Sequence, residues 1–88
     1  MYQGEKYRGP GLITQGDLKA EVECEYEVSR VDGTVDWHGR FSGAEPASEP
    51  EPGKALLVAG GKRGSILVVR TFAGTGSGRF EGDGPPPA

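Results

Sequence analysis

The stretch DLKAEVECEYEVS, residues 17–29, has the clearest structural pattern in this chain. From Leu18 to Val28 the even positions are apolar or nearly so, and the odd positions are all charged. Wound as a helix, these residues would leave no single apolar stripe to bury, whereas a strand puts alternate side chains on opposite faces. The stretch therefore predicts a half-buried β-strand, although glutamate alone favours helix.

A tight hairpin is predicted at Asp32-Gly33, because both residues tolerate the positive φ that such a turn requires. If the loop has two residues, each apolar side chain on one face of the hairpin lies opposite an apolar residue or a glycine. On the other face, acidic residues lie opposite basic ones. The expected partners are Val28 with Trp37, Tyr26 with Gly39, Cys24 with Phe41, Glu27 with His38, and Glu25 with Arg40. A four-residue loop keeps this parity, whereas a three-residue loop would reverse it unless a bulge restored the register.

Further strands are predicted on both sides of this hairpin. A short strand at residues 11–14 precedes it, residues 54–59 and 65–72 form a second hairpin, and residues 79–81 form a last short strand. The two strands of the second hairpin carry consecutive apolar residues, so both of their faces are expected to be covered. The predicted fold class is all-β, a small antiparallel barrel or sandwich of about six strands with essentially no helix.

Three segments are predicted to lie outside the sheet. Residues 1–6 are polar and expected to be loosely held, and residues 42–53 predict a mobile loop because they are rich in proline and glutamate. Residues 84–88 form a proline-rich tail, which ends the fold because proline cannot donate to a ladder. The chain of 88 residues predicts one small β domain, residues 1–88, with a thin core.

The composition of the chain bears on its cellular compartment and on whether it binds a membrane or nucleic acid. The single cysteine cannot form an internal disulfide and no secretion signal is evident near Met1, so a cytoplasmic protein is predicted. The longest apolar run, residues 66–69, falls far short of the roughly 20 residues of a membrane span. A net charge of −3 gives no general attraction to nucleic acid, so neither a membrane nor nucleic acid is predicted as a partner.

The densest cluster of recognising side chains is WHGR at residues 37–40. An anion could be held by His38 and Arg40, or a proton transferred by His38, but glutamates on the facing strand compete with both uses. The structural alternative is a set of surface ion pairs beside a core tryptophan. The candidate ligand-binding residues are Tyr7, Trp37, His38 and Arg40.

Other candidates for chemistry have simpler structural interpretations. Residues 74–78, GTGSG, mimic a phosphate-binding loop but no helix follows them. Cys24 belongs to the buried face of its strand, which predicts packing rather than nucleophilic chemistry. The basic hairpin tip Lys62-Arg63, with Arg70 and Arg79 expected nearby, is the one basic patch that could meet a phosphate backbone, but it lacks stacking aromatics beside it. A lone histidine argues against a metal site. With these structural interpretations for each candidate, no catalytic residue, metal or cofactor is predicted.

Three landmarks resemble a known family: YRGP at residues 7–10, VDG at 31–33 running into WHGR, and GRF at 78–80 followed by glycines and prolines. Together they resemble a small all-β actinobacterial domain family of unknown function, whose members stand alone or are appended to flavin-dependent monooxygenases. His38 stands where that family more often has an aromatic residue. The resemblance implies a fold and an enzyme neighbourhood, and it transfers no site residue.

The expected function is that of a non-enzymatic small β interaction or accessory module, which associates with itself or with a partner protein. The alternative is a small-ligand-binding domain that uses the region of residues 37–40. A concave pocket containing the candidate side chains would favour the ligand, whereas a filled core with an exposed sheet edge would favour protein association.

Overall fold

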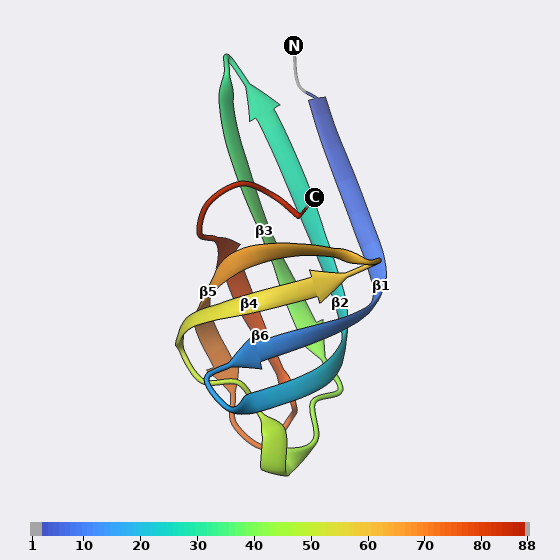
Figure 1. Ribbon diagram of the computed structural model, residues 1–88, viewed down its shortest axis with the longest axis vertical. Helices are drawn as coiled ribbons and strands as arrows, with labels where there is room; N and C mark the ends of the chain where they lie inside the picture. Colours follow the sequence, from blue (N-terminus) through green and yellow to red (C-terminus); the bar gives the residue numbers. More distant parts are fainter. Residues whose placement is uncertain (1–2, 88) are drawn as a thin grey trace.

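The computed structural model describes residues 3–87 and closes six antiparallel strands into a small barrel (Figure 1). The strand order around the barrel is β1-β2-β3-β6-β5-β4. This arrangement confirms the all-β prediction and resolves the choice between barrel and sandwich. The elements are β1 (Gln3–Gln15), β2 (Leu18–Val31), β3 (Thr34–Ser42), the 3-10 helix η1 (Pro46–Ser48), β4 (Gly53–Ala59), β5 (Lys62–Phe72) and β6 (Ser77–Gly82).

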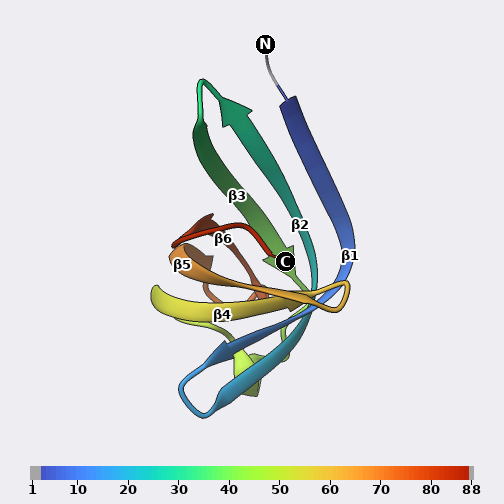
Figure 2. The same cartoon turned by 45° about the horizontal axis from the view of Figure 1, so that its top comes forward.

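The first three strands are longer than the barrel that they help to close. β1 pairs with β4 only through Gly11–Thr14, and β3 pairs with β6 only through His38–Phe41. Beyond these pairings, residues 3–10, 23–31 and 34–37 continue as a three-stranded extension that stands away from β4 and β5 (Figure 2). The molecule is accordingly elongated, with principal extents of 42 × 21 × 20 Å.

The hairpin between β2 and β3 has the predicted register. Asp32 and Gly33 form its two-residue loop with φ values of 51° and 77°, the left-handed geometry of a type I′ turn. All five predicted cross-strand pairs are present, including Val28 with Trp37 and Glu25 with Arg40. The turn chemistry and the alternation in β2 were therefore sufficient to set which side chains face inward.

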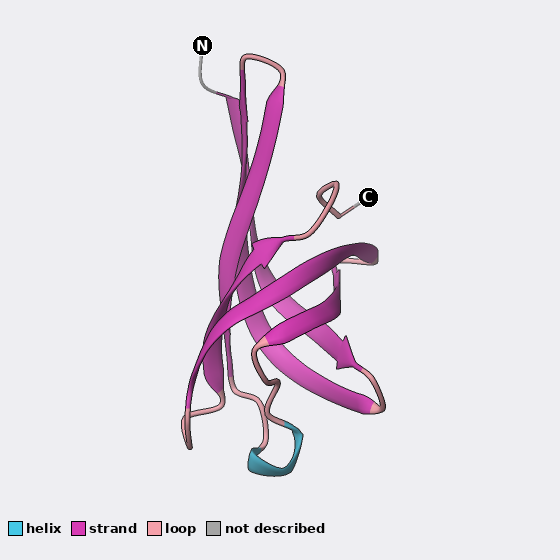
Figure 3. Ribbon diagram, turned by 90° about the vertical axis from the view of Figure 1, so that its left-hand side faces the viewer, coloured by secondary structure: helices cyan, strands magenta, loops and turns pink. Residues whose placement is uncertain are grey.

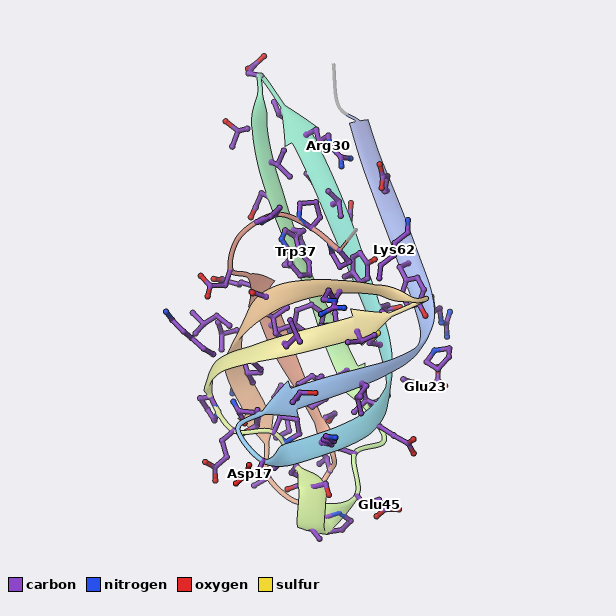
Figure 4. The ribbon with its side chains drawn as sticks, viewed as in Figure 1. Asp17, Glu23, Arg30, Trp37, Glu45 and Lys62 are labelled. Carbon is purple, nitrogen blue, oxygen red and sulfur yellow. The ribbon has the colours of Figure 1, made fainter. Side chains whose placement is uncertain are left out.

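The core fills the barrel and is crossed by a row of aromatic rings. Tyr26 stacks on Tyr7 at 5.3 Å and meets Trp37 edge-on at 5.7 Å, and Trp37 meets Phe80 edge-on at 6.2 Å. Trp37 Nε1 donates a hydrogen bond of 2.9 Å to the carbonyl oxygen of Gly84, which ties the proline-rich tail to the core (Figure 4). The buried hydrophobic side chains are Ile13, Ala20, Val22, Cys24, Val28, Trp37, Phe41, Ala44, Leu57, Ala59, Ile66, Val68 and Phe80.

Two sequence-based expectations are wrong. β1 begins at Gln3, so residues 3–6 are not loosely held, because the long β2 supplies a partner for each of them; residues 1–2 lie outside the described part. The strands of the second hairpin are not covered on both faces. Leu67 and Val69 are 37% and 43% exposed, because a six-stranded barrel encloses one face of each strand and nothing in residues 3–87 forms a second layer over the other.

The segment of residues 42–53 packs across the end of the barrel opposite the extension, where it forms η1 (Figure 3). The backbone N–H of Ala44 donates to the carbonyl oxygen of Gly76 at 3.0 Å, and Glu49 Oε1 accepts from the N–H of Gly76 at 2.9 Å. Ala44 and Pro50 are buried. The Gln15 side chain also exchanges two hydrogen bonds with the backbone of Glu51, so the segment predicted to be a mobile loop is held against the barrel at three points. Across residues 3–87, no helix is long and apolar enough to span a membrane.

Candidate functional site

The structure divides the four candidate ligand-binding residues between the two faces of the sheet. Trp37 is 1% exposed and belongs to the core, whereas His38 and Arg40 are exposed on the outer face of β3. Tyr7 stacks on Tyr26 beside the core. Because neighbouring residues of a strand point to opposite faces, Trp37 cannot share a pocket wall with its neighbour His38.

An open hollow of about 570 Å³ lies over β1, β2, β3 and β6, and Tyr7, His38 and Arg40 contribute to its lining. Trp37 does not line it. Most of the remaining lining is charged, so the hollow differs from the mainly apolar clefts that bury small ligands. Its charged side chains and its histidine are Lys6, Arg8, Glu25, Glu27, His38, Arg40 and Arg79.

Four arginines stand in one line across the sheet, and three of them, Arg8, Arg40 and Arg79, line this hollow. Cross-strand pairing joins Arg8 to Glu25, Glu25 to Arg40, Arg40 to Arg79 and Arg79 to Arg70. Directly paired residues point to the same face of a sheet. We call Arg8, Arg40, Arg79 and Arg70 the arginine row; they come from β1, β3, β6 and β5 and are all exposed.

Only one carboxylate stands within the line of the arginine row. Glu25 Oε1 forms an ion pair with Arg40 Nε. In residues 3–87, no ion pair involves Arg8, Arg79 or Arg70. The guanidinium carbon of Arg70 lies 5.2 Å from the centre of the Phe72 ring, a contact that leaves its hydrogen-bond donors available.

The structure assigns Cys24 to the core rather than to this site. Its side chain is 3% exposed, and burial, followed by the nearby charge of Glu23, raises the pKa of its thiol to about 11. A thiol with that pKa remains protonated near neutral pH and is a poor nucleophile. Within the described residues, no three histidine, cysteine, aspartate or glutamate side chains gather as potential metal ligands.

The free edge of β1 is a second exposed feature. Gln15 and Leu18 flank the two-residue loop between β1 and β2, and residues in that position form a hydrogen-bonded pair. Hydrogen-bonded pairs alternate with non-hydrogen-bonded pairs along an antiparallel ladder. The backbone N–H and C=O groups of the odd-numbered residues of β1 therefore bond to β2, and those of the even-numbered residues point to the opposite side of the strand. Lys6 and Arg8 thus direct backbone N–H and C=O groups outward, and Pro10, which has no N–H, has the same parity.

The sequence interpretation grouped Arg70 and Arg79 with the hairpin tip at Lys62-Arg63 and did not place them beside Arg40. Alternation alone could have placed Arg40 on an outer face, and the predicted hairpin did so. The pairing of β3 with β6, which brings Arg79 beside Arg40, joins strands that are far apart in the chain and leaves no local signal. Comparisons with family models, with curated proteins and with solved structures find no match to this chain.

Proposed function

We propose that this protein is a non-enzymatic accessory module that associates with a second copy or with a partner protein through the edge of its three-stranded extension. The observation that carries the proposal is the pairing of β1: in the described residues, positions 3–10 have β2 on one side and no strand on the other. An exposed strand edge of this kind accepts a further strand from another chain.

The composition of the edge supports selective rather than indiscriminate association. Lys6 and Arg8 are exposed at the edge, and charged side chains together with Pro10 limit uncontrolled pairing of edges. Val31 and Val35, at the tip of the extension, are 43% and 46% exposed. A partner strand would gain main-chain hydrogen bonds along β1, and the valines at the tip offer apolar contact nearby.

A proline at the outward-facing position 6 tests the edge. Lys6→Pro removes one outward N–H and, like Pro10, leaves the bonds to β2 intact, so the variant should fold and lose association. Lys6→Ala is the matched control, because it removes the charge and retains the N–H. Light scattering across a concentration series measures the mass of the wild type and both variants.

The expected result is a mass that rises with concentration for the wild type and Lys6→Ala, and a constant monomer mass for Lys6→Pro. Association of Lys6→Pro equal to that of the wild type would rule out the β1 edge as the interface. If the wild type is monomeric throughout, self-association is excluded, and the same variants are then compared in crosslinking to partner proteins in cell extract.

A further inference from the structure

The arginine row opposes like charges at two successive positions. Arg79 lies between Arg40 and Arg70, each directly across from it on a neighbouring strand. Like charges at directly opposed positions disfavour the sheet. The chain as a whole has a net charge of −3, so this line of positive charge is not one part of a generally basic surface.

The neighbouring row provides an internal comparison. The next row on the same face lies two residues away on each strand. In it, Lys6 pairs with Glu27, Glu27 with His38, and His38 with Glu81. That row alternates bases with acids across β1, β2, β3 and β6, as expected for a solvated sheet face. The same four strands carry three arginines and one glutamate in the arginine row, and β5 adds a fourth arginine.

The scaffold holds the centre of the row rigidly. Arg79 lies between Gly78 and Phe80, both of which are buried. Its backbone therefore belongs to a strand that is packed on its inner face, while its side chain stands free on the outer face. Sites placed on strands are held more precisely than sites placed on loops.

We propose that the arginine row binds a compact anion that carries several phosphate groups, with Arg79 at the centre and Arg40 and Arg70 on either side. Arginine suits this role because its planar guanidinium pairs two N–H donors with two phosphate oxygens. Neighbouring strands lie about 4.8 Å apart, so the backbones of the three arginines span roughly 10 Å. The bound anion supplies the negative charge that the row lacks.

An acidic peptide or nucleic acid fits the row less well. Side chains on one face of an extended peptide recur at roughly 6.6 Å, which exceeds the spacing of neighbouring strands. A longer polyanion would pass the exposed or half-buried glutamates of β2, at positions 21, 23, 25 and 27. Base stacking along the row would need a series of aromatic rings beside the arginines. Trp37 and Phe80 are buried, and the exposed Phe72 beside Arg70 is a single ring at one end of the row. The three arginines proposed to hold the anion lie on β3, β6 and β5, away from the β1 edge.

Titration calorimetry with sodium tripolyphosphate at low salt tests the proposal, using the wild type, Arg79→Gln and Arg63→Gln. Arg63 is an exposed arginine outside the row, so both variants change the net charge equally. Arg79→Gln loses one charge-assisted contact, so its affinity for tripolyphosphate should be about tenfold lower than that of the wild type, or lower still. Arg63→Gln should bind tripolyphosphate like the wild type. Arg79→Lys should fall between them, because lysine keeps the charge and loses the fork.

Three outcomes would overturn the proposal: no heat of binding by the wild type at millimolar tripolyphosphate, equal weakening by Arg79→Gln and Arg63→Gln, or tighter Arg79-dependent binding of an oligoglutamate peptide or single-stranded RNA. Thermal unfolding verifies that each variant is folded. Light scattering on Arg79→Gln separates this site from the edge, because its association should equal that of the wild type.

Discussion

At the scale of single residues, Cys24 illustrates how the sheet controls reactivity. Its sulfur faces the backbone of Gly11, where an added Cβ would lie only 2.7 Å from Sγ. This close approach covers the thiol on the side of β1. The pKa of Cys24 is raised from its ordinary value of 9.0 to about 11, first by burial and then by the charge of Glu23.

Cys24 should therefore react slowly in the native protein. Titration with a neutral thiol reagent at pH 8 is expected to be much slower in buffer than in denaturant, and equal rates would contradict burial. Because the folded pKa is the higher one, the contribution to stability is complete below pH 9.0 and is lost as pH rises toward about 11. Cys24→Ala should lack this part of the alkaline loss of stability.

Gly39 is a position where any side chain should be costly. A Cβ there would lie 2.2 Å from the carbonyl oxygen of Glu25 and 2.7 Å from the Phe80 ring, so the backbone itself would have to move. We expect Gly39→Ala to lower the free energy of unfolding by about 1–3 kcal/mol or more. Urea denaturation measures the change. Ser42→Ala, at an exposed position of the same strand, is the control and should stay within about 0.5 kcal/mol.

At the scale of the strands, the arginine row predicts that Arg79, the central residue of the proposed anion site, lowers the stability of the folded protein when no anion is bound. Arg79→Gln removes two cross-strand repulsions and breaks no ion pair in residues 3–87. Without a ligand, this variant should be more stable than the wild type by about 0.2–1 kcal/mol at low salt. The gain should shrink at high salt because exposed charges are screened.

Urea denaturation at two salt concentrations checks this expectation. A loss of stability on Arg79→Gln at low salt would mean that the arginine is held by contacts other than charge, and it would remove the physical reason for an anion at this position. Arg63→Gln, outside the row, is expected to change stability less at either salt concentration.

At the scale of the whole molecule, we expect no binding to nucleic acid. The acidic odd positions of β2 form a line of negative charge along the longest strand. Trp37, Phe41 and Phe80 are buried, which leaves Phe72 as a single exposed ring at one end of the arginine row. Titrations against single- and double-stranded DNA and RNA at low salt should show no binding at micromolar protein. Salt-sensitive binding at that concentration would contradict this expectation.

Features that depend on neighbouring residues could be predicted before the structure. The alternation from Leu18 to Val28 indicated a strand with one buried face, and Asp32-Gly33 indicated the tight turn. Together they predicted the register of β2 with β3 and the inward direction of Trp37. Both signals are local, because the pleat repeats every second residue and the turn requires positive φ at two adjacent positions.

Features that depend on barrel closure were decided only by the fold in three dimensions. The pairings of β1 with β4 and of β3 with β6 join distant segments, and their registers follow from how a twisted sheet meets itself. For the same reason the sequence did not predict that Leu67 and Val69 are exposed or that Arg40, Arg79 and Arg70 stand side by side. Periodicity assigns a side chain to a face, whereas only closure of the barrel determines its neighbours across the sheet.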